Sequence, residues 1–170
     1  MLLPDVNILV YAHREDSPHH GQSLAWLETL INSDAAFAIS DLVLSGFLRI
    51  VTHPKIFNPP SALKDALIFV EQIRKQPNCV IISTQQRHWE IFTSLCVEVN
   101  AKGNLIPDAY FAALAIETGS EWITTDRDFS RFKGLRWSYP CRASRIKPTA
   151  PCGRLVVTFN FHQEVGKNET

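Results

Sequence analysis

Four short apolar runs alternate with amphipathic helical segments over residues 1–138 of this 170-residue chain. The first run ends at Pro4, and the others cover residues 36–39, 80–82 and 122–124. In the segments between them, apolar residues recur every three or four positions, which is the spacing of an amphipathic helix. Parallel strands need helix-sized crossovers and are buried on both faces, so they are short and apolar throughout. The pattern predicts an α/β fold, a three-layer sandwich with a mainly parallel central sheet flanked by helices.

The chain changes texture after Ser138. Residues 139–153 are rich in Pro, Arg, Ser and Cys without a period, and a strand-like LVVTFNF run then leads to a polar end. A length of 170 residues suits one compact core. The sequence therefore predicts one domain over residues 1–138 and a C-terminal extension over residues 139–170 that is irregular or weakly ordered.

Composition narrows the setting in which the protein works. Lys and Arg together number 17, as do Asp and Glu, so bulk charge does not favour binding to polyanions, although a local basic groove stays compatible with it. No apolar run reaches the length of a membrane span, and Pro4 and Asp5 interrupt the start where a signal peptide would be apolar. The four cysteines form no CxxC pair. We expect a soluble, cytoplasmic protein with free thiols and no membrane partner.

Acidic residues follow the predicted strands where a parallel sheet binds its ligands. Asp5 follows the first strand, Asp126 and Asp128 follow the fourth, and Asp108 opens a predicted helix. Ligands of such sheets bind beyond the carboxyl ends of the strands. If the first and fourth strands are neighbours, these carboxylates converge, and convergent carboxylates with water suit Mg²⁺ or Mn²⁺.

Helix capping is the alternative explanation for each of these acids. Asp108 follows a proline at a helix start, and Asp126 and Asp128 precede the short segment DFSRF, so each can cap a helix. Asp5 is harder to explain in this way. A charge directly after a buried strand is costly without a partner, and Asn7 alone would be a weak one.

Four blocks of sequence resemble one known family. PDVNILVYAH, SDLVLSGFLRIVTHP, NLIPDAYFAALAIETG and WITTDRDFSRFKGLRW, in this order, resemble the PIN domain and specifically the VapC-type ribonuclease toxins of type II toxin–antitoxin systems. The resemblance covers residues 1–138 and implies a PIN-like sandwich. It also implies a metal-dependent endoribonuclease that hydrolyses RNA with a metal-activated water.

The resemblance assigns roles to particular residues. It implies that Asp5, Asp108 and Asp126 are the catalytic, metal-binding acids, with Mg²⁺ as the cofactor and Mn²⁺ as an alternative. Four kinds of support are expected around them: Asn7 orienting Asp5, Thr124 or Thr125 behind Asp126, Asp128 as a helper, and Arg49 on the RNA backbone. For Arg49 a solvated helix face or a salt bridge explains the residue equally well.

The implied partners are an RNA substrate, a cognate antitoxin and a second copy of the chain in a homodimer. One departure from the family pattern matters: Gly46 stands where many PIN domains carry a glutamate, and Asp41, Glu15 or Asp16 are the acids that could replace it. The site then has one carboxylate fewer than usual. The alternative function is a catalytically degenerate PIN-like module that binds RNA or antitoxin without cleavage.

Overall fold

The computed structural model describes residues 1–140 and 157–159. Its centre is a five-stranded sheet in which every pairing is parallel and the strand order is β3-β2-β1-β4-β5. The strands are β1 (Leu2–Pro4), β2 (Phe37–Ser40), β3 (Cys79–Ile82), β4 (Glu121–Ile123) and β5 (Trp137–Ser138). The prediction of a mainly parallel sheet is confirmed, and β5, which the sequence did not predict, extends the sheet beside β4.

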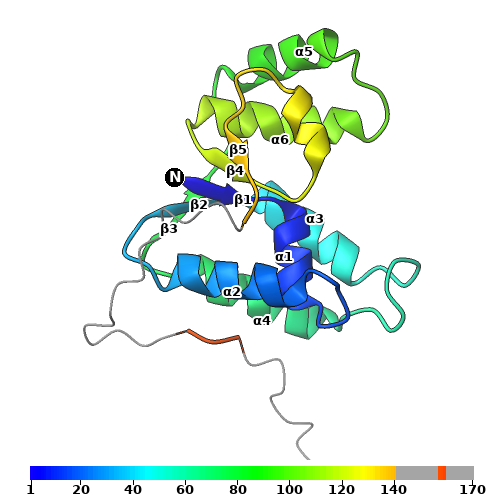
Figure 1. The fold of residues 1–170 in the computed structure, drawn as a ribbon, viewed down its shortest axis with the longest axis vertical. Helices are drawn as coiled ribbons and strands as arrows, with labels where there is room; N and C mark the ends of the chain where they lie inside the picture. Colours follow the sequence, from blue (N-terminus) through cyan, green and yellow to red (C-terminus); the bar gives the residue numbers. More distant parts are fainter. Residues whose placement is uncertain (141–156, 160–170) are drawn as a thin grey trace, which may run out of the picture.

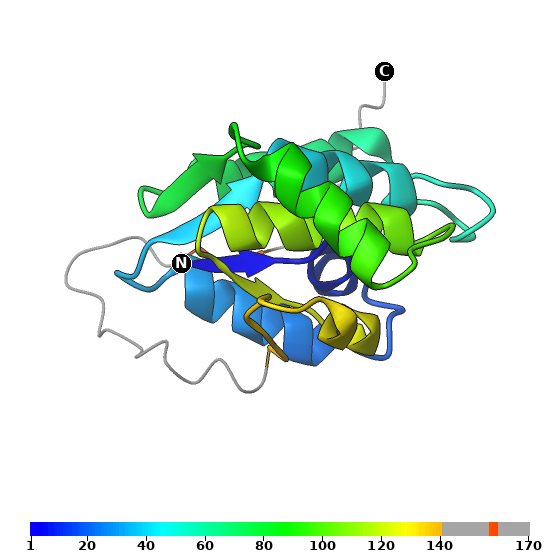
Figure 2. The same ribbon diagram turned by 90° about the horizontal axis from the view of Figure 1, so that it is seen from above.

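Within the described residues, six α-helices and a short 3₁₀ helix surround the sheet. They are α1 (Val6–His13), α2 (His20–Ile31), α3 (Asp41–Val51), α4 (Leu63–Arg74), α5 (His88–Glu98), α6 (Leu105–Glu117) and η1 (Arg127–Arg131). In Figure 1 the pair α5 and α6 lies above the strands and α2 and α4 lie below them, and Figure 2 shows the same layers from above. The prediction of helices flanking a parallel sheet is therefore confirmed. Among the described residues, no helix has both the length and the apolar character needed to cross a membrane.

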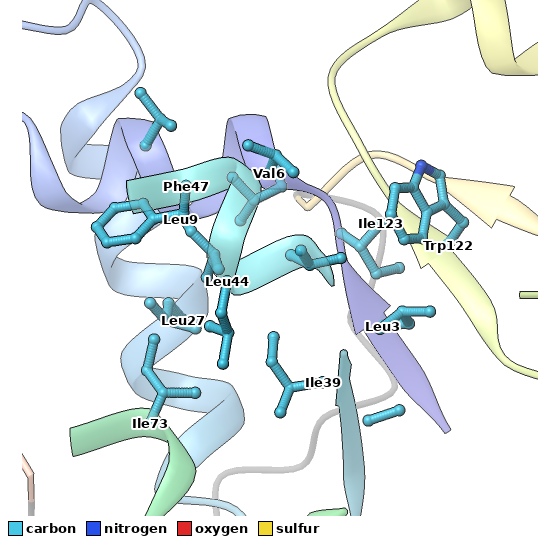
Figure 3. Close-up of a cluster of buried hydrophobic side chains, with 14 of the residues drawn as sticks. Leu3, Val6, Leu9, Leu27, Ile39, Leu44, Phe47, Ile73, Trp122 and Ile123 are labelled. Atoms are coloured by element: carbon cyan, nitrogen blue, oxygen red, sulfur yellow. The ribbon is translucent and has the colours of Figure 1, made fainter. Parts of the chain in front are cut away.

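The core forms where α1, α2 and α3 pack against the strands. Figure 3 shows Leu9, Leu27 and Phe47 from three helices meeting beside Ile39 of β2, all of them buried. Their burial removes apolar surface from water, the main stabilising contribution to a fold of this size. The helices are short, so tertiary packing rather than intrinsic propensity holds them in place.

The strand order reverses at β1. From β1 the chain adds β2 and then β3 on one side of the sheet, and it then returns to add β4 and β5 on the other side. β1 and β4 are therefore neighbours in the sheet, and the point between them is the topological switch point. Their register pairs Pro4 with Ile123. Asp5 and Thr124 are thus the next residues on two adjacent parallel strands, and the backbone N–H of Asp5 donates to the carbonyl of Ile123 at 2.8 Å. A switch point is where open α/β sheets bind ligands.

Residues 157–159 contact helices α2 and α4, from which they are distant in the sequence. The Asn32 side chain accepts from the backbone N–H of Val157 at 2.9 Å and donates to its carbonyl at 2.9 Å. Phe159 is buried, with its ring 4.8 Å from that of Phe69 on α4. Of the predicted extension over residues 139–170, residues 141–156 and 160–170 lie outside the described part of the chain.

Candidate active site

A cleft of about 970 Å³ opens at the switch point, and we call it the acid cleft. Asp5, Asn7, Asp108 and Asp126 line it together with Arg49 from α3. β1 and β4 position the first and last of these acids, and α6 brings in Asp108. The structure thus brings the three predicted acids to one cleft, although Asp5 is more than 100 positions from the other two in the sequence.

Asp5 is the N-cap of α1 in an extended backbone conformation, but its side chain does not cap the helix. Instead, Asp5 Oδ2 accepts a hydrogen bond from Thr124 Oγ1 at 2.5 Å, across from the end of β4. The residue is only 6% exposed. The capping explanation thus fails for the Asp5 side chain, because this hydrogen bond joins it to the neighbouring strand and not to its own helix.

Thr124 connects the two sides of the switch point. Its hydroxyl donates to Asp5 and accepts from Asn7 Nδ2 at 3.0 Å and from the backbone N–H of Asp126 at 3.0 Å. A hydroxyl has one donor and two acceptor positions, so all of them are used. Asn7 therefore orients Asp5 through Thr124 rather than by the direct hydrogen bond expected from the sequence. Of the two threonines considered, Thr124 makes these contacts, and support by Thr125 stays a prediction.

Burial and neighbouring charge raise the pKa of two acids of the cleft, Asp5 and Asp108. Burial raises the pKa of Asp5 to about 7, opposed by the Thr124 hydrogen bond, and the charges of Asp108 and Asp126 raise it further. Burial also raises the pKa of Asp108 to about 6, with contributions from Asp126 and Asp128. Groups that shift one another's pKa lie within electrostatic reach, so these carboxylates form one coupled set.

Asp126 also caps a helix, as the alternative explanation suggested. Its Oδ1 accepts from the backbone N–H of Asp128 at 2.8 Å and so begins η1. Asp128 is exposed and pairs with Arg131 at 3.0 Å. Capping fixes the orientation of the Asp126 carboxylate without removing it from the acid cleft, so the two roles coexist.

Asp108 lies inside its helix rather than at its start. The sequence places a loop over residues 105–107, but α6 begins at Leu105 and includes Pro107 in its first turn. Proline is tolerated there because the first N–H groups of a helix have no intrahelical partner. Asp108 is therefore in the first turn, near the positive end of the helix dipole, and its side chain faces the acid cleft.

The other candidate acids lie elsewhere. Asp41 forms an ion pair with Arg74 of α4, and Glu15 and Asp16 line a separate cavity, where Asp16 pairs with Arg14 at 2.7 Å. None of them is a lining residue of the acid cleft. Gly46 itself lines the cleft, and a Cβ built on it would lie 3.0 Å from Val6 Cγ2. The close packing of α3 on α1 thus leaves little room for a glutamate at this position.

A hard cation fits the donors of the acid cleft. Three carboxylates repel one another there, and Asn7 Oδ1 is a buried oxygen with no hydrogen-bond partner in the described structure. Oxygen donors of this kind suit Mg²⁺ and Mn²⁺. Within residues 1–140 and 157–159, no three His, Cys, Asp or Glu side chains already form a compact metal-binding group. The oxygen donors of the cleft are therefore of the type that such an ion prefers. Water or substrate oxygens would have to supply the remaining ligands.

The sequence reasoning missed the apolar wall of the acid cleft. Phe92 of α5 and Tyr110 and Phe111 of α6 line it beside Asp108, and Ile56 and Phe57 line it from the segment after α3. No sequence signal could have found this wall, because α5 and α6 were predicted separately and nothing indicated which faces they share. Arg49, by contrast, is exposed and lines the cleft, which is compatible both with a phosphate contact and with a solvated helix face.

Comparison with known proteins agrees with this geometry. The family model of the PIN domain matches residues 2–135. The chain is 41% identical to a VapC ribonuclease of Mycobacterium bovis over 82% of this chain and 95% of the relative. It is also 41% identical to ribonuclease VapC25 of Mycobacterium tuberculosis over 82% of this chain and 99% of the relative.

Solved structures share the fold at low sequence identity. VapBC2 from Rickettsia felis, bound to a DNA fragment from their promoter, contains a chain that matches with a TM-score of 0.58 at 19% identity, covering 81% of this chain and 97% of that one. FitAcB from Neisseria gonorrhoeae matches with a TM-score of 0.55 at 18% identity, covering 84% and 99%. With the family model and the relatives in agreement over nearly the whole described domain, this chain belongs to the PIN domain family, in its VapC group.

Proposed function

We propose that the protein is the ribonuclease toxin of a toxin–antitoxin pair, a Mg²⁺-dependent endoribonuclease. The observation that carries the proposal is the coupled set of Asp5, Asp108 and Asp126 at the β1–β4 switch point. The names of the relatives, which are ribonucleases, support RNA as the substrate. The likeness to VapBC structures supports an antitoxin as partner, and a homodimer is the expected assembly of the toxin.

Asp5, Asp108 and Asp126 would hold the cation. When bound, Mg²⁺ supplies positive charge against a phosphate oxygen and makes a bound water more acidic. Thr124 holds one oxygen of Asp5 in place, and Asn7 and the Asp126 backbone hold Thr124. This chain of hydrogen bonds fixes the carboxylates before substrate arrives, so little reorganisation is left for the reaction.

Asp126 is the residue best placed to orient the attacking water. Its side chain lines the acid cleft while one of its oxygens is held by the Asp128 N–H. Arg49 lies exposed on the α3 wall of the same cleft and supplies the positive charge that a phosphodiester backbone needs. Cleavage with these roles leaves a 3′-hydroxyl and a 5′-phosphate.

A second function is favoured by one observation. Gly46 removes the additional carboxylate of many PIN domains, and Val6 packs close to that position. A module with this weakened donor set could bind RNA or antitoxin without cutting. Titration calorimetry with Mg²⁺ and Mn²⁺ separates the two functions. Absence of metal binding at millimolar concentrations would favour the non-cleaving module, and binding would favour the nuclease.

Substitution of the acids tests the proposed function directly. Asp5→Asn and Asp108→Asn should each abolish RNA cleavage in Mg²⁺ while circular dichroism stays unchanged. Asp16→Asn is the matched control, since Asp16 is an exposed acid that pairs with Arg14 outside the acid cleft. Cleavage that persists in both cleft variants, or that survives complete chelation of metal, would refute the metal-dependent nuclease.

A further inference from the structure

Trp89 is the most exposed tryptophan that the structure describes. It lies in the first turn of α5 and is 68% exposed. Most of this large aromatic side chain stays in contact with water, so it does not contribute to the hydrophobic core. An exposed aromatic side chain that continues into a larger group of aromatic residues is a candidate contact for a ligand.

The Trp89 ring is the outer end of a row of aromatic rings. Its centroid lies 5.5 Å from that of Phe92, and Phe92 lies 5.4 Å from Tyr110 of α6. We call Trp89, Phe92 and Tyr110 the aromatic ladder. Phe92 and Tyr110 line the acid cleft, and Tyr110 is two residues from Asp108 in the same helix. The ladder therefore runs from exposed Trp89 to two aromatic residues that line the same cleft as Asp108.

The ladder is held rigidly at its inner end. Buried His88 makes a hydrogen bond through Nε2 to the carbonyl of Tyr110 at 3.1 Å, and its ring lies 4.2 Å from the Tyr110 ring. The Trp89 and Phe92 rings meet at 54°, a tilted contact. Trp89 stays largely exposed beside this contact, so a flat ring can stack on it.

We propose that the aromatic ladder is a base-stacking subsite that positions single-stranded RNA with a phosphodiester at the acid cleft. This inference rests on the proposed function, because it names how the same site holds its substrate. Aromatic side chains bind unpaired bases by stacking on their ring faces, with little regard for sequence. Continuity with Asp108 favours RNA as the occupant, because a strand with its phosphate at the carboxylates must place flanking bases nearby.

Trp89 is in this view a positioning residue that acts on binding and not on the chemical step. Loss of one stacking contact should weaken RNA binding roughly 5- to 150-fold. The kcat of the active protein should change little, while KM rises by a similar factor. Trp89→Phe keeps an aromatic face and should restore most of the affinity.

The experiment uses the full chain with Asp108→Asn, so that bound RNA is not cut. Probes are a short oligoadenylate and a ribose-phosphate oligomer of the same length without bases. Trp89→Ala should weaken binding of oligoadenylate and leave binding of the abasic oligomer unchanged. Val97→Ala is the matched control: Val97 is also an exposed α5 residue, at 82%, and is not a lining residue of the cleft.

The possible outcomes separate this inference from the proposed function. Equal affinity of Trp89→Ala and its parent for oligoadenylate would overturn the subsite, and so would equal losses for both probes. Unchanged RNA affinity together with lost antitoxin binding would also overturn it and assign the ladder to a protein contact. If Trp89-dependent RNA binding is found but the unmodified chain cleaves no RNA, the subsite stands and the nuclease proposal fails.

Discussion

The two ends of helix α1 carry two buried titratable groups whose pKa values are shifted in opposite directions. Asp5 at its N-terminus has a pKa raised to about 7, and His13 in its last turn has a pKa lowered to about 4. Burial is the largest cause of both shifts, since it disfavours whichever form is charged. The same physical effect therefore produces a neutral acid at one end of the helix and a neutral base at the other.

The surroundings of the two groups separate their roles. The His13 ring lies 5.3 Å from Phe47 and 5.1 Å from Phe69, and its Nε2 is 3.1 Å from Ser61 Oγ. The neighbouring charges only adjust its pKa: Arg14 and His20 lower it and Asp65 raises it. Asp5 instead lines an open cleft with two further carboxylates of the same charge.

A perturbed pKa alone does not identify a functional residue. Structural packing shifts the pKa of His13 nearly as far as the acid cleft shifts that of Asp5. What distinguishes the N-terminal end is a cavity and a set of like charges that a cation would relieve, which are the features of a site. The two ends of α1 should therefore respond differently to substitution, to pH and to metal.

The largest expected effect is on RNA cleavage. Asp5→Asn should reduce kcat/KM by at least about 100-fold, because a ligand oxygen of the site is lost. His13→Asn should change it by no more than about threefold, since no reacting group depends on the imidazole. Initial rates on a fluorescent RNA at saturating Mg²⁺ measure both. A folded His13→Asn protein that is as inactive as Asp5→Asn would contradict the claim that only the Asp5 end of α1 takes part in cleavage.

The pH dependence of stability should separate the two groups next. In the metal-free protein, folded Asp5 keeps its proton up to about pH 7, whereas aspartate in the unfolded chain loses its proton near pH 3.8. Asp5 therefore makes the free energy of unfolding fall as the pH rises from 3.8 to 7. Folded His13 stays neutral down to about pH 4 whereas unfolded histidine protonates near 6.5, so it raises stability with pH over that window.

The two contributions oppose each other in the native chain, and substitution should expose each one. Relative to the native chain, Asp5→Asn should make the slope of unfolding free energy against pH more positive between pH 4 and 6.5, and His13→Asn should make it more negative, each by up to about 1.4 kcal/mol per pH unit. Asp108 adds to the Asp5 slope, since its pKa is also raised. Urea unfolding with a chelator present measures these slopes. Parallel slopes in the two variants would contradict the assignments.

A smaller effect is expected from the extension that closes the His13 end. Phe159 packs on Phe69, which in turn contacts the His13 ring. Phe159→Ala should lower the free energy of unfolding by about 1–2 kcal/mol, because a docked segment can detach and limits the loss. Thermal unfolding measures it, with exposed Thr158→Ala as control. Reduced RNA cleavage in Phe159→Ala at unchanged stability would mean that the two ends are coupled.

The smallest expected effect is stabilisation by the cation. Mg²⁺ at about ten times its Kd should stabilise the native chain at pH 8 by about 1.4 kcal/mol, since only the folded state assembles the acid cleft. Asp5→Asn should lose this gain, and His13→Asn should keep it. Thermal melts with and without Mg²⁺ decide the matter. An equal gain in all three proteins would place the cation outside the acid cleft.

Much of the fold could be predicted because its signals are local. The apolar runs predicted four of the five strands, and the apolar spacing predicted the helices to within a few residues. β5 was missed because Trp137–Ser138 is only two residues long, and its place in the sheet depends on pairing with β4. The start of α6 was misjudged because a proline in the first turn resembles a loop.

The candidate site was predicted in its members but not in its connections. Asp5, Asp108 and Asp126 could be singled out because each follows a strand or begins a helix. That Thr124 holds Asp5, and that Asn7 acts through Thr124, depends on the β1–β4 register. The exposure of Trp89 also depends on the tertiary structure, because the apolar pattern of its helix does not reveal which side chains are exposed.

The order of apolar and polar residues by itself determined a parallel α/β sheet with acids at the ends of its strands, since periodicity and strand-end chemistry are properties of neighbouring residues. Only the tertiary structure decided which strands are adjacent, which oxygens share a hydroxyl, and which of two buried groups faces a cleft. Those features arise between segments that are distant in the sequence, more than 100 residues apart at the β1–β4 switch point, where burial and charge act through space and not along the chain.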